Sequence, residues 1–220
     1  TTATNPATTE TTATTTENPE IAYIRELYEQ CQKDFPNIKI PFEEYLKIRD
    51  RRITLIGDSI SVMTSPRLAE FFPNIQISAK SNRQSYHAFE FYNQLKAEGR
   101  IGDVVILALG ANGHIDYETF DQVRADIGNK PLIINTVILP WPVTEAERNE
   151  SIHKYAKERK NVFVAKWYEH CKNMPGILYD DGVHPIETVG ATAHAYVMME
   201  AVYEALTSTE KTEKIEDKKR

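Results

Sequence analysis

Five short runs of β-branched and aliphatic residues recur along the chain and strongly constrain its fold. These runs lie at residues 53–56, 75–77, 104–109, 132–139 and 162–164. They are nearly continuous rather than alternating, which is typical of strands covered on both faces. Apolar side chains at helical spacing lie around and between them, at residues 21–35, 42–48, 85–98, 117–127 and 191–206. We therefore predict one α/β domain, a three-layer α/β/α sandwich around a five-stranded parallel sheet.

The two ends of the chain differ in composition from this domain. Half of the first twenty residues are Thr, with almost nothing apolar to bury, so we expect residues 1–19 to form a disordered linker. This segment is either a flexible end or a tether to an upstream region, which would suit a chain that begins with Thr rather than Met. We expect the folded domain at 20–207 and a charged, disordered tail at 208–220.

Charge and hydropathy exclude two broad classes of protein. The 220 residues include 32 acidic and 26 basic side chains, for a formal charge of −6, and no basic block stands out. This balance argues against a nucleic-acid partner. The longest apolar stretch, residues 104–109, is far shorter than the roughly 20 residues of a membrane span, so we expect a soluble fragment.

Cys31 and Cys171 are the only cysteines, and neither lies in a CxxC pair. That count argues against a structural zinc site, which needs three or four ligands at short spacing. Two separate buried thiols are one interpretation. If the protein is exported, a disulfide is the other, and it would close a loop of roughly 140 residues worth about 4–5 kcal/mol.

Polar motifs follow the predicted strands, where parallel sheets collect functional residues. GDSI at 57–60 follows the first run and GANG at 110–113 the third. KSNRQ at 80–84 follows the second run, and DDGVHP at 180–185 lies beyond the last. We expect these four segments to meet at one edge of the sheet.

Four residues in these motifs have the chemistry of acyl transfer. A serine is a useful nucleophile only when a base removes its proton and a third group orients the base. Ser59 suits the nucleophile, His184 the base and Asp181, three residues before it, the orienting carboxylate. The backbone N–H of Ser59 and the amide of Asn112 suit an oxyanion hole. Each motif alone also fits an ordinary turn or helix cap, but their conjunction favours catalysis.

GDSI, GANG and DGVHP together resemble the motifs of the SGNH, or GDSL-like, hydrolase superfamily, over residues 52–206. The resemblance implies a flavodoxin-like α/β/α fold with Ser59 as nucleophile, His184 as base, Asp181 as its orienting partner and Asn112 as an oxyanion donor. The second block departs from the family, because Asn82 stands where a glycine is usual. Asn tolerates positive φ, so we expect Asn82 to keep the backbone donor, with a side chain that narrows the pocket.

Within the superfamily, the GDSISVM, RQS, GANG and DGVHPIETVGATAHA segments resemble the extracytoplasmic domain of type-A peptidoglycan O-acetyltransferases. The resemblance implies two-step transfer of an acetyl group through Ser59 to the 6-hydroxyl of N-acetylmuramoyl residues in cell-wall glycan. It also implies an upstream membrane acyltransferase domain, a location on the outer face of the membrane and no metal or organic cofactor. A secreted carbohydrate or lipid esterase with the same apparatus is the alternative.

Two other classes of protein fit the motifs less well. A non-catalytic binding module would not need an intact Ser59, Asp181, His184 and Asn112. A nucleotide-binding protein would show a phosphate-binding glycine loop after its first strand, where this chain has GDSISVM.

Several further side chains allow either a functional or a structural interpretation. The residues that lie near strand ends and suit stacking on a glycan are Tyr86, His114, Trp141 and Tyr179. Arg83 suits a substrate contact or a loop-orienting role. The remaining histidines are expected in ordinary surface or core positions: His87, His153, His170 and His194.

Overall fold

Five parallel strands form the centre of the molecule, in the order β2-β1-β3-β4-β5. The computed structural model describes residues 18–217, with side chains described as far as Ser208. The strands are β1 Ile53–Gly57, β2 Ile75–Ala79, β3 Val104–Ala108, β4 Leu132–Asn135 and β5 Val162–Ala165. All neighbouring pairs are parallel. The predicted α/β/α class and the five-stranded parallel sheet are therefore confirmed.

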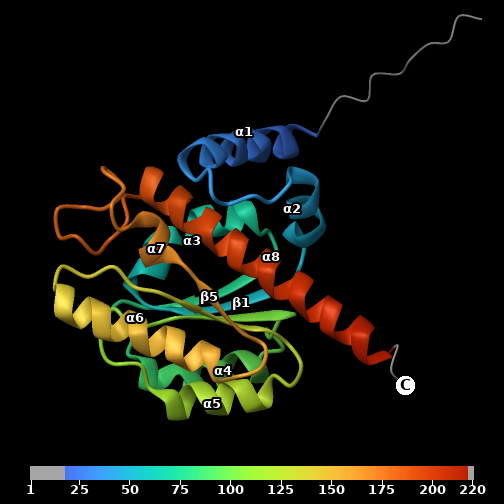
Figure 1. Cartoon of the computed structure of the whole chain (residues 1–220), viewed down its shortest axis with the longest axis vertical. Helices are drawn as coiled ribbons and strands as arrows, with labels where there is room; N and C mark the ends of the chain where they lie inside the picture. Colours follow the sequence, from blue (N-terminus) through green and yellow to red (C-terminus); the bar gives the residue numbers. More distant parts are fainter. Residues whose placement is uncertain (1–17, 218–220) are drawn as a thin grey trace, which may run out of the picture.

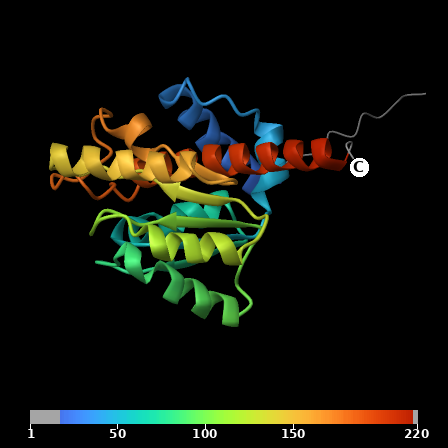
Figure 2. The same cartoon turned by 60° about the horizontal axis from the view of Figure 1, so that its bottom comes forward.

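Helices cover both faces of the sheet (Figure 1). On one face lie α3 Ser59–Phe71, α7 Trp167–Cys171 and α8 Val189–Asp217, with α1 Pro19–Asp34 and α2 Phe42–Arg49 packed outside them. On the other lie α4 Ala88–Ala97, α5 Tyr117–Asp126 and α6 Pro142–Lys157. Figure 2, turned by 60°, shows the strands between α8 (red) on one side and α4 and α5 (green) on the other. Both faces of the sheet are therefore covered, and the inner strands β1, β3 and β4 are fully buried.

The central strand β3 shows how the two cores divide. Val104 and Ile106 belong to the core under α3 and α8, whereas Val105 and Leu107 belong to the core under α4 and α5. All five residues of β3 are buried. This two-sided burial explains why the strand reads as a continuous apolar run.

Some boundaries differ from the sequence-based expectation. The run at 132–139 is a strand only as far as Asn135, because β5 ends at Ala165 and the backbone beyond loses its strand partner. The segment 85–98 splits into a 3₁₀ turn, Ser85–His87, followed by α4. Helix α8 continues to Asp217, so most of the expected tail at 208–220 is helical, in a stretch rich in the strong helix formers Glu and Lys. The expected linker at 1–19 lies almost wholly outside the described residues.

The N-terminal helices form an aromatic layer over α8. Asn18 caps α1 by accepting a hydrogen bond from the Glu20 N–H, and Pro19 occupies the first helical position. Tyr28 stacks with Tyr45 and meets Tyr196 of α8 edge-on. These rings anchor α1 and α2 to the domain.

Cys31 and Cys171 are free thiols, and both are buried in this same core. Burial raises the pKa of the Cys31 thiol to about 12 and also raises the pKa of Cys171. The interpretation as buried thiols, rather than a disulfide, describes the structure.

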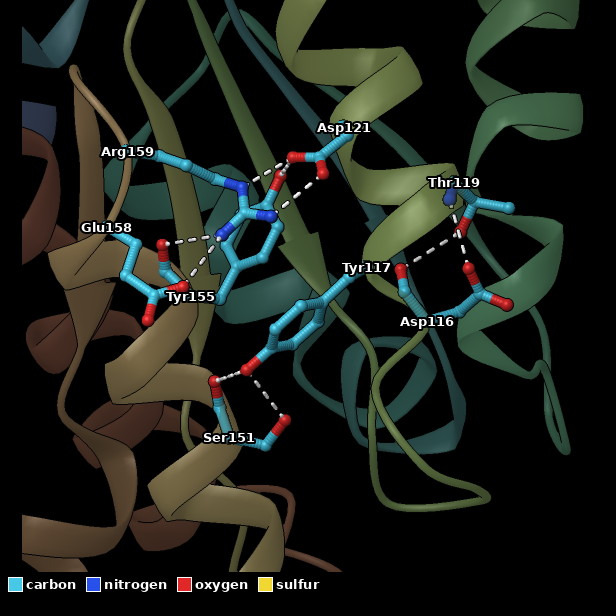
Figure 3. A network of polar contacts seen from close by, with 8 residues as sticks. All are labelled: Asp116, Tyr117, Thr119, Asp121, Ser151, Tyr155, Glu158 and Arg159. Atoms are coloured by element: carbon cyan, nitrogen blue, oxygen red, sulfur yellow. Dashed lines mark hydrogen bonds and ion pairs between the residues drawn. The ribbon is translucent and has the colours of Figure 1, made fainter.

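A polar network joins α5 to α6 across the other face (Figure 3). Arg159 binds the Asp121 carboxylate, with Nη2 2.8 Å from Oδ2, and Tyr155 donates to the same carboxylate at 2.9 Å. The Tyr117 hydroxyl donates to the Ser151 carbonyl at 2.7 Å. These contacts fix α6 beside the sheet, and α6 in turn supports the candidate site.

Candidate active site

The candidate site lies at the carboxyl edge of the sheet, where the strand order reverses. From β1 the chain goes first to β2 on one side and then to β3 on the other. Open α/β sheets leave a crevice at such a switch point, beyond the strand ends. Ser59 follows β1 and the Gly110–Gly113 loop follows β3, so the two motifs border this crevice.

Ser59 is the first residue of α3, directly after β1. The Asp58 carboxylate caps the helix by accepting the Ile60 N–H at 3.1 Å. Gly57 is required at the preceding position, because a Cβ atom there would collide with the Ser61 side chain. The strand-to-helix turn therefore presents the Ser59 hydroxyl beside the free N–H groups of the helix N-terminus.

Asp181 and His184 lie in a loop just before α8. The loop is closed at its base, where the Tyr179 N–H donates to the His184 carbonyl at 2.9 Å. Asp181 Oδ1 accepts from the backbone N–H groups of Val183 at 2.9 Å and of His184 at 3.0 Å. Its Oδ2 lies 2.7 Å from Nδ1 of His184. The carboxylate thus orients both the loop and the imidazole.

The charge of Asp181 suits this role. Partial burial acts to raise its pKa, but the hydrogen bonds from the His184 backbone and imidazole and from the Val183 N–H outweigh burial and lower the pKa to about 2. The carboxylate therefore stays ionised at any ordinary pH and can accept the Nδ1–H of His184.

Nε2 of His184 lies 2.9 Å from Oγ of Ser59. The structure therefore brings together the three residues that the sequence assigns to a triad, in the order Ser59, His184, Asp181. Ser59 and His184 are only partly buried, so a substrate can reach the hydroxyl. This arrangement can remove the serine proton and return it to a leaving alcohol.

The turn at 80–83 forms the other side of the crevice. It is tied to β1 by the Lys80 N–H, which donates to the Gly57 carbonyl at 3.2 Å. Asn82 has φ 61°, a left-handed conformation of the kind that the sequence analysis expected Asn to tolerate at this position. The Asn112 amide reaches the same turn, with Nδ2 3.5 Å from the Arg83 carbonyl. Asn82 and Asn112, two of the three expected oxyanion donors, thus lie on neighbouring loops at one edge of the sheet.

Arg83 is a structural part of this turn. It is buried, donates to the Ser78 carbonyl, and stacks its guanidinium over Phe91 at 3.7 Å from the ring centre. Burial lowers its pKa, against the opposing charges of Asp58 and Glu90. Of the two interpretations left open for Arg83, these contacts favour the loop-orienting one. A pocket of about 440 Å³ adjoins the turn through Asn82 and Arg83.

Asp58 contributes more than the sequence analysis assigned to it. The side chain is buried, and burial raises its pKa to about 6, although hydrogen bonds from the Ile60 and Ala111 N–H groups and the nearby His184 act to lower it. Through Ala111 the carboxylate joins the GANG loop to the Ser59 turn. It is therefore a positioning group for both loops.

Helix α6, which the sequence analysis did not predict, supports the loops beyond β3 and β4. Glu145 Oε2 accepts the Leu139 N–H at 2.6 Å, and the Asn149 amide pairs with the Val137 N–H and carbonyl at 2.8 and 2.9 Å. Arg148 donates to the Gly110 carbonyl. The apolar pattern of the sequence does not indicate this helix, because few of its residues are apolar. Pro142 at its start and lysines in its last turn are the signals for it.

The other candidate residues divide into exposed and paired groups. Three of the four residues considered for glycan stacking are exposed aromatic side chains: Tyr86, Trp141 and Tyr179. His114 is also exposed, and His87 lines the pocket beside the 80–83 turn. Away from the site, His153 lies 2.5 Å from Glu169 and His170 lies 2.8 Å from Glu200, whereas His194 is fully buried. Within residues 18–208, no cluster of His, Cys, Asp and Glu is arranged to hold a metal ion.

Comparison with known proteins relates the chain to one group of enzymes. No protein-family model matches it. It is 26% identical over 150 residues to YrhL of Bacillus subtilis, a protein named as a peptidoglycan O-acetyltransferase, and 29% identical over 140 residues to the O-acetyltransferase OatA of Staphylococcus aureus. The chain resembles peptidoglycan O-acetyltransferases. The matches cover 67% and 63% of this chain but only 23% of each relative, so the chain spans about a quarter of their length.

The fold agrees with this resemblance to peptidoglycan O-acetyltransferases. The C-terminal catalytic domain of OatA from Streptococcus pneumoniae, solved with a methylsulfonyl adduct, superposes with a TM-score of 0.64 at 20% identity. The match covers 72% of this chain and 96% of that domain. The resemblance to SGNH hydrolases is thereby confirmed for the fold, and these relatives support an acyl-transferring or hydrolytic enzyme. No described helix is long and apolar enough to cross a membrane.

Proposed function

We propose that this chain is a serine-dependent O-acetyltransferase domain that moves an acetyl group onto cell-wall glycan, with residues 20–207 as its catalytic domain. The observation that carries the proposal is the continuous hydrogen-bonded arrangement of Ser59, His184 and Asp181, with spacings of 2.9 and 2.7 Å. The names of the sequence relatives support the acetyl group and the glycan as the substrates.

In the first step the Ser59 hydroxyl attacks the carbonyl carbon of an acetyl ester. Nε2 of His184 takes the hydroxyl proton as the bond between Oγ and the carbonyl carbon forms, which gives a tetrahedral intermediate, and Asp181 stabilises the resulting imidazolium. The negative charge passes to the carbonyl oxygen. The backbone N–H groups of Ser59 and Asn82 and the amide of Asn112 are the donors that we assign to it.

Collapse of the tetrahedral intermediate breaks the bond between the carbonyl carbon and the oxygen of the donor alcohol. His184 returns the proton to the departing alcohol oxygen, which leaves an acetyl group on Ser59. The second step is the reverse with a new alcohol. His184 deprotonates a sugar hydroxyl, whose oxygen attacks the acetyl carbon, and the bond between that carbon and Oγ of Ser59 then breaks as His184 returns the proton to Oγ. We assign the acceptor to the 6-hydroxyl of N-acetylmuramoyl residues, on the strength of the family resemblance.

The resemblance also supports a place for this domain in a larger protein. The relatives are about four times the length of the matched segment, since 23% of each is covered. We propose that the domain follows a membrane acyltransferase domain through the Thr-rich segment 1–19 and works on the outer face of the membrane. It needs no metal or organic cofactor for the chemistry above, and we assign it no nucleic-acid partner.

Hydrolysis is the alternative activity of the same groups. If water replaces the sugar in the second step, the domain is a carbohydrate acetylesterase. Incubation with p-nitrophenyl acetate and a chitooligosaccharide separates the two. The transferase predicts O-acetylated sugar among the products, in amounts that rise with the sugar concentration. Acetate alone, at every acceptor concentration and with a muramic acid-containing glycan as well, would establish the esterase instead.

A further inference from the structure

Trp141 is an exposed aromatic side chain beside the candidate site. Its exposed fraction is 61%, whereas the other tryptophan of the chain, Trp167, is completely buried. A tryptophan buries more apolar area than most side chains when a ligand or another protein packs against it. A largely exposed tryptophan at the edge of a site is therefore a candidate ligand contact. The mechanism above assigns it no role.

The backbone that carries Trp141 is held firmly from both sides. Trp141 is the N-cap of α6, and its carbonyl accepts the Glu145 N–H at 2.9 Å. Two residues earlier, the Leu139 N–H donates to the buried Glu145 carboxylate, and Lys172 binds both this carboxylate at 2.8 Å and the Leu139 carbonyl at 3.2 Å. The turn that carries the exposed indole is therefore fixed, so the backbone loses little conformational entropy when a ligand binds there.

This turn packs against the loop that holds His184. A Cβ atom placed on Gly182 would lie 3.8 Å from Cβ of Pro140, the residue before Trp141. Gly182 lies between Asp181 and His184, and its N–H donates to the carbonyl of Tyr179, a second exposed aromatic residue at 42%. Trp141 and Tyr179 therefore belong to the His184 side of the crevice, opposite the oxyanion turn at 80–83.

We propose that Trp141 binds the sugar acceptor by stacking on the apolar C–H face of a pyranose ring, with Tyr179 beside it. His184 must touch the alcohol oxygen in both steps, so the sugar that carries that oxygen lies beside the His184 loop. The acetyl carbonyl faces the opposite side. This inference rests on the proposed function for the identity of the acceptor, and it makes Trp141 a determinant of acceptor affinity.

Binding is tested without turnover in the Ser59→Ala variant. Because Trp167 is buried, acrylamide quenches mainly the fluorescence of Trp141. Addition of chitopentaose is expected to shift the emission saturably and to protect Trp141 from quenching. An unchanged emission and unchanged quenching at millimolar sugar would overturn the proposal.

Kinetics give the second test. Trp141→Leu keeps an apolar side chain but removes the ring, and it is expected to raise KM for the sugar about tenfold and to lower the ratio of transfer to hydrolysis. Trp141→Phe is expected to recover most of this loss. Val143→Ala changes an exposed apolar residue two positions away and serves as the matched control. An equal KM in the Trp141→Leu variant and the wild type would contradict the proposal.

The two hypotheses fail in different ways. Saturable, Trp141-dependent sugar binding without any acetyl transfer by the wild type would refute the proposed function and leave the sugar site standing. Transfer that depends on Ser59 but not on Trp141 would retain the function and remove the sugar site.

Discussion

Nε2 of His184 lies 2.9 Å from Oγ of Ser59, although 125 residues separate them in the chain. The parallel sheet brings the two residues together, because Ser59 follows the first strand and His184 lies just before the last helix. Asp181 completes the arrangement from within the same loop as His184, so only one long-range contact has to form.

Asp181→Asn is expected to lower kcat about 10³–10⁴-fold, because an amide no longer fixes the imidazole tautomer or stabilises its charge. The Asn oxygen can still accept the Val183 and His184 N–H groups, so the loop keeps its shape. Asp180→Asn, at the adjacent exposed position, is the control. Steady-state hydrolysis of p-nitrophenyl acetate and a thermal melt check both points. A kcat within tenfold of the wild type would refute the orienting role of Asp181.

Asp58→Asn is expected to change how stability depends on pH. The pKa of Asp58 is about 6 in the folded protein against 3.8 as the ordinary value, so the folded state binds the proton more tightly. The free energy of unfolding of the wild type should therefore fall as pH rises from about 4 to 6, by at most ~3 kcal/mol from this group. Asn caps α3 equally well and carries no charge. Urea titrations at pH 4 and pH 8 should show the variant gaining stability relative to the wild type only at pH 8; an equal difference at both would contradict this.

Asn82→Gly is expected to retain kcat/KM within about threefold, because glycine adopts φ 61° freely and keeps the backbone N–H. Asn82→Ala should cost roughly 1 kcal/mol of stability from the left-handed backbone. The comparison separates a backbone donor from a side-chain donor. A hundredfold loss of kcat/KM in the glycine variant would assign the role to the Asn82 side chain.

Cys31 and Cys171 are expected to remain reduced and unreactive in the folded protein. Burial raises the pKa of both thiols, so little thiolate is present at neutral pH. Alkylation with iodoacetamide, followed by mass measurement, should label neither cysteine in buffer and both in guanidinium without reductant. If neither cysteine is labelled in guanidinium until a reductant is added, the two cysteines form a disulfide and the prediction is wrong.

Much of the fold could be predicted because both faces of the sheet are covered. Strands such as β3 then appear as continuous apolar runs, and their parallel pairing follows from the alternation with helices. The segment 132–139 misled this reasoning because apolar residues continue on both sides of Asn135 and Thr136. Beyond Thr136, however, side chains of α6 rather than a neighbouring strand bind its backbone at Val137 and Leu139.

The site residues could be predicted where motif and topology coincide. Ser59, Asn112 and His184 each follow a strand or precede a helix at one edge of the sheet, so their proximity follows from the topology. Asp58, Glu145 and Arg148 could not be assigned, because their roles depend on which backbone groups they reach across the fold. Burial of a carboxylate such as Asp58 is likewise a property of the packed structure.

The central claim is that Ser59 carries the acetyl group. Brief incubation with p-nitrophenyl acetate, acid quenching and peptide mass analysis should place one acetyl group on the peptide that contains Ser59. Ser59→Ala should lose both the label and the release of p-nitrophenol. Ser65→Ala, on the same helix with its hydroxyl bound to the Ser61 carbonyl, should keep both. An acetyl group on another residue, or full activity of Ser59→Ala, would contradict the account.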